Sequence, residues 1–510
     1  MGEPREGALT AAMQLAAGEL VAALLPGARG PLIGAVQRLI HMTPGPALDV
    51  GVATAQSADK ILLKAGVAAG SMAAGAALGD RALAGVGVAT AAAAASCEDA
   101  AIGPTLLAAG AGQAAGRLGG RRPRLVALTA AAALAVDRAQ FRRIDAKRKA
   151  RPLTGRPAAA ADLPVPGISP LYTPNDTFYE TDVTARPPRV DPDRWRLRVK
   201  GMVERPLELS LDELEALGLE ELDATLVCVH NPVGGDRIGS ARWVGVPLAR
   251  LLEAAGAKEG AEQLLARSVD GFTAGVPVER IASGAPALLA IGMNGEPLPV
   301  EHGYPARLLV PGLWGADANT KWVTELELTS WEAVRDYWDR RGWPRQPSFV
   351  QPAARVDVPL NRAVVEPGTV TVAGVAWAPP EGVEGVEVQV DGGPWEAADL
   401  GAELAPTMWR QWRLTWNAEP GEHKLRVRAI GRRRAQPDAD EPPYPVGSRG
   451  YDAHRVTVAA GARRRRRVGR AAADDAVARL RLAARGLAAW RERGFPPTPR
   501  FPAPPPPSGK

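Results

Sequence analysis

The chain has 510 residues, a formal net charge of +6 and two cysteines, Cys97 and Cys228. This length is too great for one hydrophobic core, so a single-domain protein is excluded and about three domains are expected. The cysteines lie in different surroundings, an apolar alanine run and a strand-like segment, which argues against a structural disulfide between them. The basic residues form runs that no nucleic-acid-binding motif accompanies, so we expect no nucleic-acid partner.

The N-terminal third, residues 1–151, is dominated by alanine and glycine. Several of its segments are mostly Ala, Leu, Val and Gly and have close to the minimum length for crossing a bilayer. They are residues 9–25, 61–79, 82–97, 102–118 and 125–141. We interpret this part as an all-α domain of transmembrane helices. A soluble Ala-rich bundle is the alternative, because alanine is a weak membrane residue and charges such as Lys64 and Asp137 intrude.

The basic loop at 117–124 indicates how such helices would be oriented, because loops rich in Arg and Lys favour the cytoplasmic side. With five spans, the catalytic part after residue 141 would lie on the extracytoplasmic side of the cell membrane. The basic run from Arg142 to Arg151 opposes this orientation, since it would then lie on the wrong side.

A Pro- and Ala-rich stretch, residues 152–167, has the composition of a linker. From 168 to 349 the chain changes to short predicted strands and helices separated by Gly and Pro, which indicates a mixed α+β domain. Residues 195–199 alternate as a strand does. A short helix is expected after Ser210, because Glu213 follows it at the spacing of a capping box.

One stretch of this domain delivers a cysteine from a β-rich run to a glycine-rich turn. Residues 224–235 read Ala-Thr-Leu-Val-Cys-Val-His-Asn-Pro-Val-Gly-Gly. In such a turn the Cys228 thiol could reach a ligand that approaches the backbone closely. From these residues alone, the alternative is that Cys228 is a buried, inert small side chain.

The stretch resembles the molybdenum-cysteine motif of the sulfite oxidase family, in which Thr-Leu-x-Cys is followed by an asparagine, here Asn231, and then by Gly-x-Ala-x-Trp-x-Gly. Further matches follow in the family's order: Asp270 in Ser-Val-Asp-Gly-Phe, Met293 to Pro299, His302 to Arg307, Val310 to Gly312, and Lys321 to Val323. The resemblance implies a bacterial, membrane-anchored oxidoreductase that uses a molybdenum-molybdopterin cofactor.

The resemblance also implies roles for individual residues. Cys228 would be the metal-binding thiolate, a soft ligand that suits molybdenum. Tyr337 is a second catalytic candidate, for proton supply, with core packing as the alternative. The residues expected to bind the cofactor are Asn175, Phe178, Tyr179, Asn231, Asp270, His302, Arg307, Lys321, Trp322 and Val323. For Asn175 the alternative role is to cap a turn, and for His302 to be an ordinary turn residue.

Two departures from the family pattern concern the substrate. Members that oxidise sulfite carry an arginine soon after the asparagine of the cysteine motif, where this chain has Pro232 and Val233. They also carry an Arg-Asn-His group in the first cofactor segment, which here reads Phe-Tyr-Glu-Thr-Asp-Val over 178–183. A doubly charged oxyanion needs cationic partners. We therefore expect sulfite to be disfavoured unless Arg237 or Arg242 compensates.

Residues 350–459 show alternating strands separated by turn residues, with Asp391-Gly392 as a hairpin turn. This pattern predicts an antiparallel β-sandwich of about seven strands. It resembles the immunoglobulin-like domain that follows the molybdenum domain in the family and often forms dimer contacts, so a homodimer through this domain is expected. The tail, 460–510, is basic and Pro-rich, and is either solvated or a helix lying on anionic lipid.

Two functions are compatible with these features. The first is two-electron oxygen-atom transfer on a small-molecule substrate at a Cys-ligated molybdenum. No haem-attachment motif and no dinucleotide-binding glycine motif occurs, so the electron partner would be a separate protein or a membrane quinone. The second is a non-catalytic, membrane-bound cofactor-binding or sensor module, which the missing arginines suggest.

Overall fold

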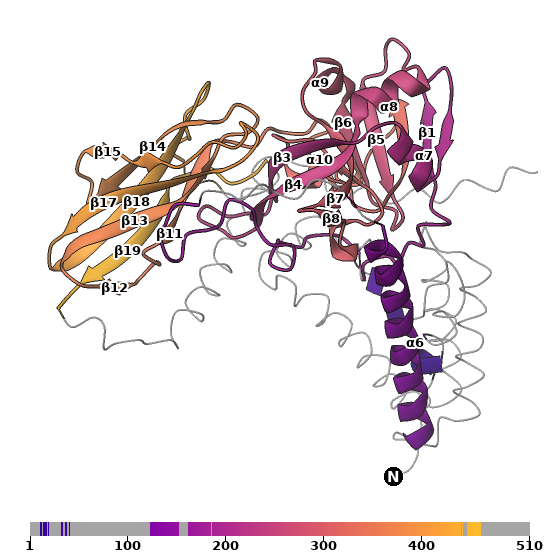
Figure 1. Cartoon of the computed structure of the whole chain (residues 1–510), viewed down its shortest axis with the longest axis horizontal. Coiled ribbons are helices and arrows are strands. Elements are labelled where there is room, and N and C mark those ends of the chain that lie inside the picture. The colour runs from indigo at the N-terminus through magenta and orange to yellow at the C-terminus, as the bar shows by residue number, and fades with distance from the viewer. Residues whose placement is uncertain are drawn as a thin grey trace, which may run out of the picture.

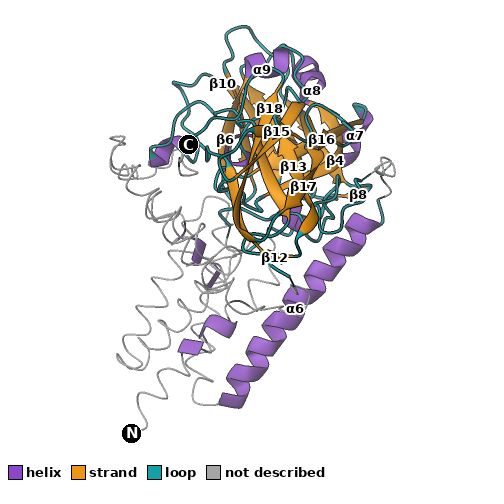
Figure 2. Ribbon diagram, turned by 90° about the vertical axis from the view of Figure 1, so that its left-hand side faces the viewer, coloured by secondary structure: helices purple, strands orange, loops and turns teal. Residues whose placement is uncertain are grey.

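The computed structural model describes residues 123–151, 153, 162–184, 186–439, 441 and 446–460, and scattered positions between 11 and 40. In this part of the chain a long helix, α6 (Pro123–Lys149), precedes a central domain of strands and short helices, which a β-sandwich follows (Figures 1 and 2). The predicted tail after residue 460 lies outside the described residues. The domain boundaries proposed from composition remain predictions.

Helix α6 covers the predicted membrane segment 125–141 and continues beyond it. Among the described residues, no helix is both long and apolar enough to cross a bilayer. Within the predicted span 125–141, the charged residues Asp137 and Arg138 interrupt the apolar stretch of α6. Of the other predicted spans, 9–25 is described at only a few helical positions, and 61–118 lies outside the described residues.

The central domain contains two sheets and several short helices, which is the mixed α+β content expected from the sequence. Its elements are β1 (Leu197–Gly201), β2 (Leu207–Leu209), α7 (Leu211–Ala216), β3 (Glu220–Val227), β4 (Ile238–Pro247), α8 (Leu248–Ala255), β5 (Gln263–Ser268), β6 (Thr273–Pro277), α9 (Val278–Ala282), β7 (Leu288–Met293), β8 (Glu296–Pro297), η1 (Val300–His302), β9 (Arg307–Leu309), α10 (Gly315–Ala318), β10 (Val323–Thr329) and η2 (Asp339–Arg341). One sheet has the order β2-β1-β10-β5-β6. The other has the order β3-β4-β7-β8, with β9 also paired to β7.

Local sequence signals explain several of these elements. The capping box predicted at Ser210 is confirmed: its side chain accepts a hydrogen bond from the Glu213 amide, and the Glu213 carboxylate accepts one from the Ser210 amide. Helix α8 ends at Gly256, whose positive φ of 66° is easily adopted by glycine. Apolar side chains of both sheets and of α7 and α8 form one buried core, which holds the two sheets together.

The C-terminal residues form two sheets packed face to face. Their strands are β11 (Ala353–Val358), β12 (Val364–Val365), β13 (Gly368–Trp377), β14 (Val383–Val390), β15 (Trp395–Ala397), β16 (Asp399–Leu400), β17 (Arg410–Ala418), β18 (Gly421–Gly431) and β19 (Asp452–Val458). The orders are β11-β13-β17-β16 and β12-β19-β18-β14-β15. The predicted Asp391-Gly392 hairpin turn is confirmed, since β14 and β15 pair across it and both residues have positive φ.

The segment that enters the central domain is bound to this sandwich. The indole nitrogen of Trp409 donates to the Leu171 carbonyl oxygen over 2.8 Å. Gln411 accepts a hydrogen bond from the Leu163 amide at 2.7 Å and donates one to the Ser169 carbonyl at 2.8 Å. Leu163 of the predicted linker 152–167 therefore contacts the sandwich, as do the first residues of the central domain.

Candidate cofactor and substrate site

Cys228 lies directly after β3, at the start of the loop that leads to β4. Its amide donates to the Arg237 carbonyl at 3.0 Å, and its carbonyl accepts from the Asn231 amide at 2.9 Å. The Asn231 side chain closes the loop by accepting from the Arg237 amide at 2.8 Å. The turn requires glycine at 235, because an added Cβ would lie 2.6 Å from the Asn231 Oδ1. Asn231 thus shapes the loop that presents Cys228.

The surroundings of Cys228 favour the thiolate. Its side chain is 3% exposed and is the free cysteine among the described residues. Burial opposes ionisation, but His230, whose Nδ1 lies 3.8 Å from the sulfur, and the charge of Arg237 hold the pKa of Cys228 below its ordinary value. Since the thiolate is the form that binds metal, this environment suits a metal ligand.

The aromatic pair Phe178 and Tyr179 lies beside this loop. The Phe178 ring stacks on Tyr179 with centroids 5.3 Å apart and contacts His302 edge to face at 5.5 Å. Gly239 on β4 makes room for it, because an added Cβ would lie 2.6 Å from the Phe178 ring. Burial and the negative charge of Cys228 raise the pKa of Tyr179, while Arg307 opposes this rise. Tyr179 therefore lies within electrostatic reach of both the cysteine and the basic residues described next.

His302, Arg307 and Lys321 converge on Gly303. An added Cβ at Gly303 would lie 3.1 Å from the Cβ atoms of both Arg307 and Lys321. Arg307 donates to the His302 carbonyl at 3.1 Å, and the Lys321 ammonium donates to the Glu301 carbonyl at 2.8 Å. The fold therefore brings together three predicted cofactor-binding residues around one glycine.

The protonation state of His302 follows from its contacts. Burial, followed by the charge of Lys321, lowers the pKa of His302 to about 3, so the imidazole is neutral at physiological pH. Its Nε2 lies 2.8 Å from the Asn175 carbonyl oxygen, which can only accept, so Nε2 carries the proton. The other ring nitrogen, Nδ1, is then an acceptor.

Several buried polar atoms around this cluster have no hydrogen-bond partner within the described part of the chain. They are His302 Nδ1, Arg307 Nε, both side-chain polar atoms of Asn319, and Thr320 Oγ1. Buried polar groups are normally paired. A bound group with anionic oxygens and polar ring atoms would satisfy them, so the residues present fit a phosphorylated pterin. Asn319 and Thr320 were missed in the sequence analysis; their only signal was their position directly before Lys321.

The remaining predicted cofactor residues have structural contacts of their own. Asp270 Oδ1 accepts from the Phe272 amide at 3.0 Å and closes the turn between β5 and β6. The Trp322 indole donates to the Val300 carbonyl at 2.8 Å, and the Val323 side chain lies in the buried core. The side chains of Trp322 and Val323 therefore support the site from within the core.

Tyr337 is fully buried and packs against Trp338, with ring centroids 5.0 Å apart. Trp338 in turn stacks on Trp343 at 4.3 Å, and both indoles lie near His230, at 6.3 Å and 6.0 Å between centroids. Tyr337 thus belongs to a cluster of buried residues that also contains Val227 and Val229, on either side of Cys228. The tryptophans were not recognised as site residues, because nothing in their sequence spacing points to His230.

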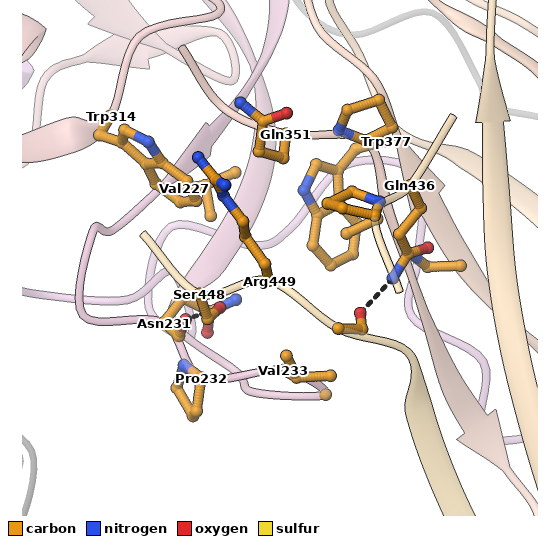
Figure 3. Close-up of a pocket in the computed structure, with 16 residues that line it drawn as sticks. Val227, Asn231, Pro232, Val233, Trp314, Gln351, Trp377, Gln436, Ser448 and Arg449 are labelled. Carbon is orange, nitrogen blue, oxygen red and sulfur yellow. Dashed lines mark hydrogen bonds between the residues drawn. The ribbon is translucent and has the colours of Figure 1, made fainter. Parts of the chain in front are cut away.

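A pocket lies between the cysteine loop and the sandwich (Figure 3). Its walls include Val227 and Asn231, on either side of Cys228, and Trp314. The sandwich contributes Arg449, whose side chain extends towards Trp314 (Figure 3), and Ser448, which donates to the Asn231 carbonyl at 2.7 Å. No sequence signal links Arg449 to this loop, because its place in the pocket wall depends on how the two domains pack.

The two arginines considered as compensating cations differ. Arg242 is paired with Asp223, with Nη2 to Oδ2 at 2.7 Å, and lies over the Tyr172 ring. It is therefore held on the strand surface away from the pocket. Arg237 is 8% exposed, and its charge contributes to lowering the pKa of Cys228.

Comparisons with known proteins agree with this site. Residues 184–338 match the family model for the oxidoreductase molybdopterin binding domain. The chain is 33% identical over 322 residues to sulfite oxidase of Gallus gallus, covering 53% of this chain and 69% of that protein. It is 33% identical over 302 residues to the mitochondrial sulfite oxidase of Mus musculus, covering 50% of this chain and 55% of the mouse protein. The match thus spans about half the length of the mouse relative.

A solved structure shares the fold. The sulfane dehydrogenase SoxCD of Paracoccus pantotrophus matches with a TM-score of 0.51 and 22% identity, covering 62% of this chain and 92% of that chain. The fold and the site define a molybdopterin-binding oxidoreductase domain. The chain belongs to the sulfite oxidase family of molybdenum-dependent oxidoreductases.

Proposed function

We propose that the chain catalyses two-electron oxygen-atom transfer on a small substrate, with Cys228 as the protein ligand to molybdenum. The observation that carries this proposal is the buried Cys228, whose surroundings favour the thiolate, beside a cluster of buried polar groups without partners. When bound, the molybdopterin cofactor supplies the two-electron redox chemistry.

Different residues of the protein would bind different parts of that cofactor. Arg307 and Lys321 would bind the phosphate, since charge-assisted hydrogen bonds to a buried anion are strong. His302 Nδ1 would accept a hydrogen bond from the pterin. Phe178 and Tyr179 would cover the cofactor between this cluster and Cys228, and the pocket near Arg449 would admit substrate beside the cysteine loop.

Metal and pterin analysis of the purified full-length protein tests the proposal. We expect close to one molybdenum and one pterin for each chain, and loss of both when Arg307 and Lys321 are replaced by alanine. A protein isolated under molybdate-replete conditions that contains neither group would contradict the proposal and support a non-catalytic module.

The preferred substrate in this proposal is a neutral oxide, such as a sulfoxide or N-oxide, rather than sulfite. Pro232 and Thr181 occupy positions where the sulfite-oxidising pattern carries arginines. Of the two nearby cations, Arg449 is shared with Glu441, whose Oε2 lies 3.5 Å from its Nε, and Arg237 is buried in the cysteine loop. Both features support a pocket that holds a doubly charged anion poorly.

The proposal also includes a cell-membrane location, an electron partner that is a protein or quinone, and a homodimer through the sandwich. The apolar composition of residues 9–118 supports membrane attachment. The extracytoplasmic placement of the catalytic domain depends on an odd number of spans. Protease accessibility in intact spheroplasts tests this placement, and light scattering of the detergent-solubilised protein tests the dimer.

A further inference from the structure

The C-terminal turns of α6 are attached to the central domain by ion pairs. Lys147 Nζ lies 2.6 Å from carboxylate oxygens of both Asp191 and Asp193. Arg151, just after the helix, pairs with Asp212 and with Glu215. The basic run that opposed the predicted membrane orientation is thus partly engaged by acidic residues of the central domain. Figures 1 and 2 show this end of α6 against that domain while the rest of the helix projects away.

The same end of α6 contributes to the hydrophobic cluster beneath the candidate site. Ile144 is 7% exposed and belongs to the cluster that contains Phe178, Trp243 and Tyr304. Phe141, one turn earlier, packs against this cluster. The helix therefore covers the side of the cluster that supports an aromatic residue of the proposed cofactor site.

Arg148 is the most deeply buried of these basic residues, at 5% exposed. Its Nη1 donates to the Pro297 carbonyl at 2.6 Å and to the Glu296 Oε2 at 3.0 Å. The other oxygen of Glu296 accepts from the Asn175 Nδ2 at 2.7 Å. The Asn175 carbonyl accepts from His302 Nε2 at 2.8 Å. An unbroken series of hydrogen bonds and covalent links therefore joins helix α6 to His302.

We propose that Arg148 of α6 is a positioning residue for the cofactor pocket, acting on His302 through Glu296 and Asn175. Arg148 fixes one carboxylate oxygen of Glu296, and the other orients Asn175. The Asn175 carbonyl then fixes the ring and tautomer of His302, which leaves Nδ1 as the acceptor facing the ligand. Loss of a partner that orients a metal-binding group commonly costs about 10–100-fold in affinity or activity. Arg148 acts on His302 through two intermediates, so its effect should lie at the low end of this range. The inference rests on the proposed placement of the cofactor beside His302.

The test measures how fast the loaded, full-length protein releases pterin, followed by fluorescence of the oxidised pterin, for matched variants of α6. We expect Arg148→Gln to release the cofactor about tenfold faster than the wild type. Lys147→Ala is the control, because it removes two ion pairs between α6 and the central domain but no hydrogen bond of the series from Arg148 to His302. Its rate of pterin release should stay within about twofold of the wild-type rate. Arg148→Lys should release pterin more slowly than Arg148→Gln, because the lysine ammonium can still bind Glu296.

A double-mutant comparison separates positioning from simple loosening of the helix. Glu296→Ala should accelerate pterin release as Arg148→Gln does. The double variant should release pterin little faster than either single variant, since both substitutions break the same series of hydrogen bonds. Equal pterin release rates in Arg148→Gln and Lys147→Ala would overturn the inference, and so would fully additive effects of Arg148→Gln and Glu296→Ala. If Arg148→Gln does not fold, Glu296→Ala carries the test alone, because the Glu296 side chain is 41% exposed. A normal release rate in His302→Ala would instead overturn the cofactor placement in the proposed function.

Discussion

The Ser448 hydroxyl of the sandwich donates a 2.7 Å hydrogen bond to the main-chain oxygen of Asn231, three residues after Cys228. The loop that presents the cysteine is therefore held from both domains. Within the central domain the Asn231 side chain accepts from the Arg237 amide. The sandwich thus contributes to the shape of the site as well as to a wall of its pocket.

Replacing Ser448 with alanine should loosen this loop without unfolding the sandwich. Loss of one hydrogen bond of about 1 kcal/mol predicts a decrease in kcat/KM of roughly fivefold. The melting temperature should change little. Thr457→Ala, which removes a hydroxyl bond to Glu422 elsewhere in the sandwich, is the matched control. Equal kinetic effects of the two substitutions would show that the loop contact is unimportant.

Cys228→Ser should abolish oxidoreductase turnover while most of the pterin remains bound. One metal bond would be lost, but the contacts proposed between Arg307 or Lys321 and the cofactor phosphate would remain. Pterin content and turnover are measured on the same preparation, with Cys97→Ser as the control for removing a thiol. Unchanged turnover in the Cys228 variant would eliminate its catalytic assignment.

Sulfite should have a lower specificity constant than a neutral sulfoxide or N-oxide. Each missing charge-assisted contact removes roughly 1.5–3 kcal/mol, which corresponds to about one to two orders of magnitude in selectivity. Steady-state kinetics with both substrate classes decide between them. Residual sulfite turnover should depend on Arg449, so Arg449→Met should lower it further and leave sulfoxide turnover nearly unchanged. A higher specificity constant for sulfite would show that Arg237 and Arg449 together form an effective anion site.

Asp317 on α10 should make the protein less stable as the pH rises. Burial, together with the charge of Asp336, raises the pKa of Asp317 to about 8 from an ordinary value of 3.8. The folded protein holds this proton more tightly than the unfolded chain. The resulting contribution to stability is therefore complete below pH 3.8 and is lost progressively as the pH rises to about 8.

Asp317→Asn cannot ionise, so it should flatten this part of the stability profile. A rise in pKa from 3.8 to about 8 corresponds to about 5 kcal/mol, so at pH 8 the variant should be more stable than the wild type by several kcal/mol, and near pH 4 the difference should disappear. Urea denaturation at both pH values measures the effect. Asp399→Asn removes an exposed carboxylate, 79% accessible, and serves as the control. A constant difference between variant and wild type across this range would contradict the assignment.

The short-range features were predictable because they depend on neighbouring residues. The capping box at Ser210 and Glu213, the hairpin turn at Asp391 and Gly392, and the strand that delivers Cys228 to a glycine-rich loop are all encoded within a few positions. The family motifs pointed to His302, Arg307 and Lys321 for the same reason. Composition was less reliable for α6: its alanines indicated a helix, but its charges belong to an interface with the central domain.

Other parts of the site depend on tertiary structure, because they join residues that only folding brings together. Ser448 reaches Asn231 across 217 positions of sequence, and Arg148 reaches Glu296 across 148. Spacing and hydrophobic pattern carry no information about such pairs, since they report which face of an element is buried but not which partner buries it. The sequence by itself thus determined the family, the cofactor and the cysteine loop. Only the packing of α6 and the sandwich against the central domain decided which charges surround that loop and what supports His302.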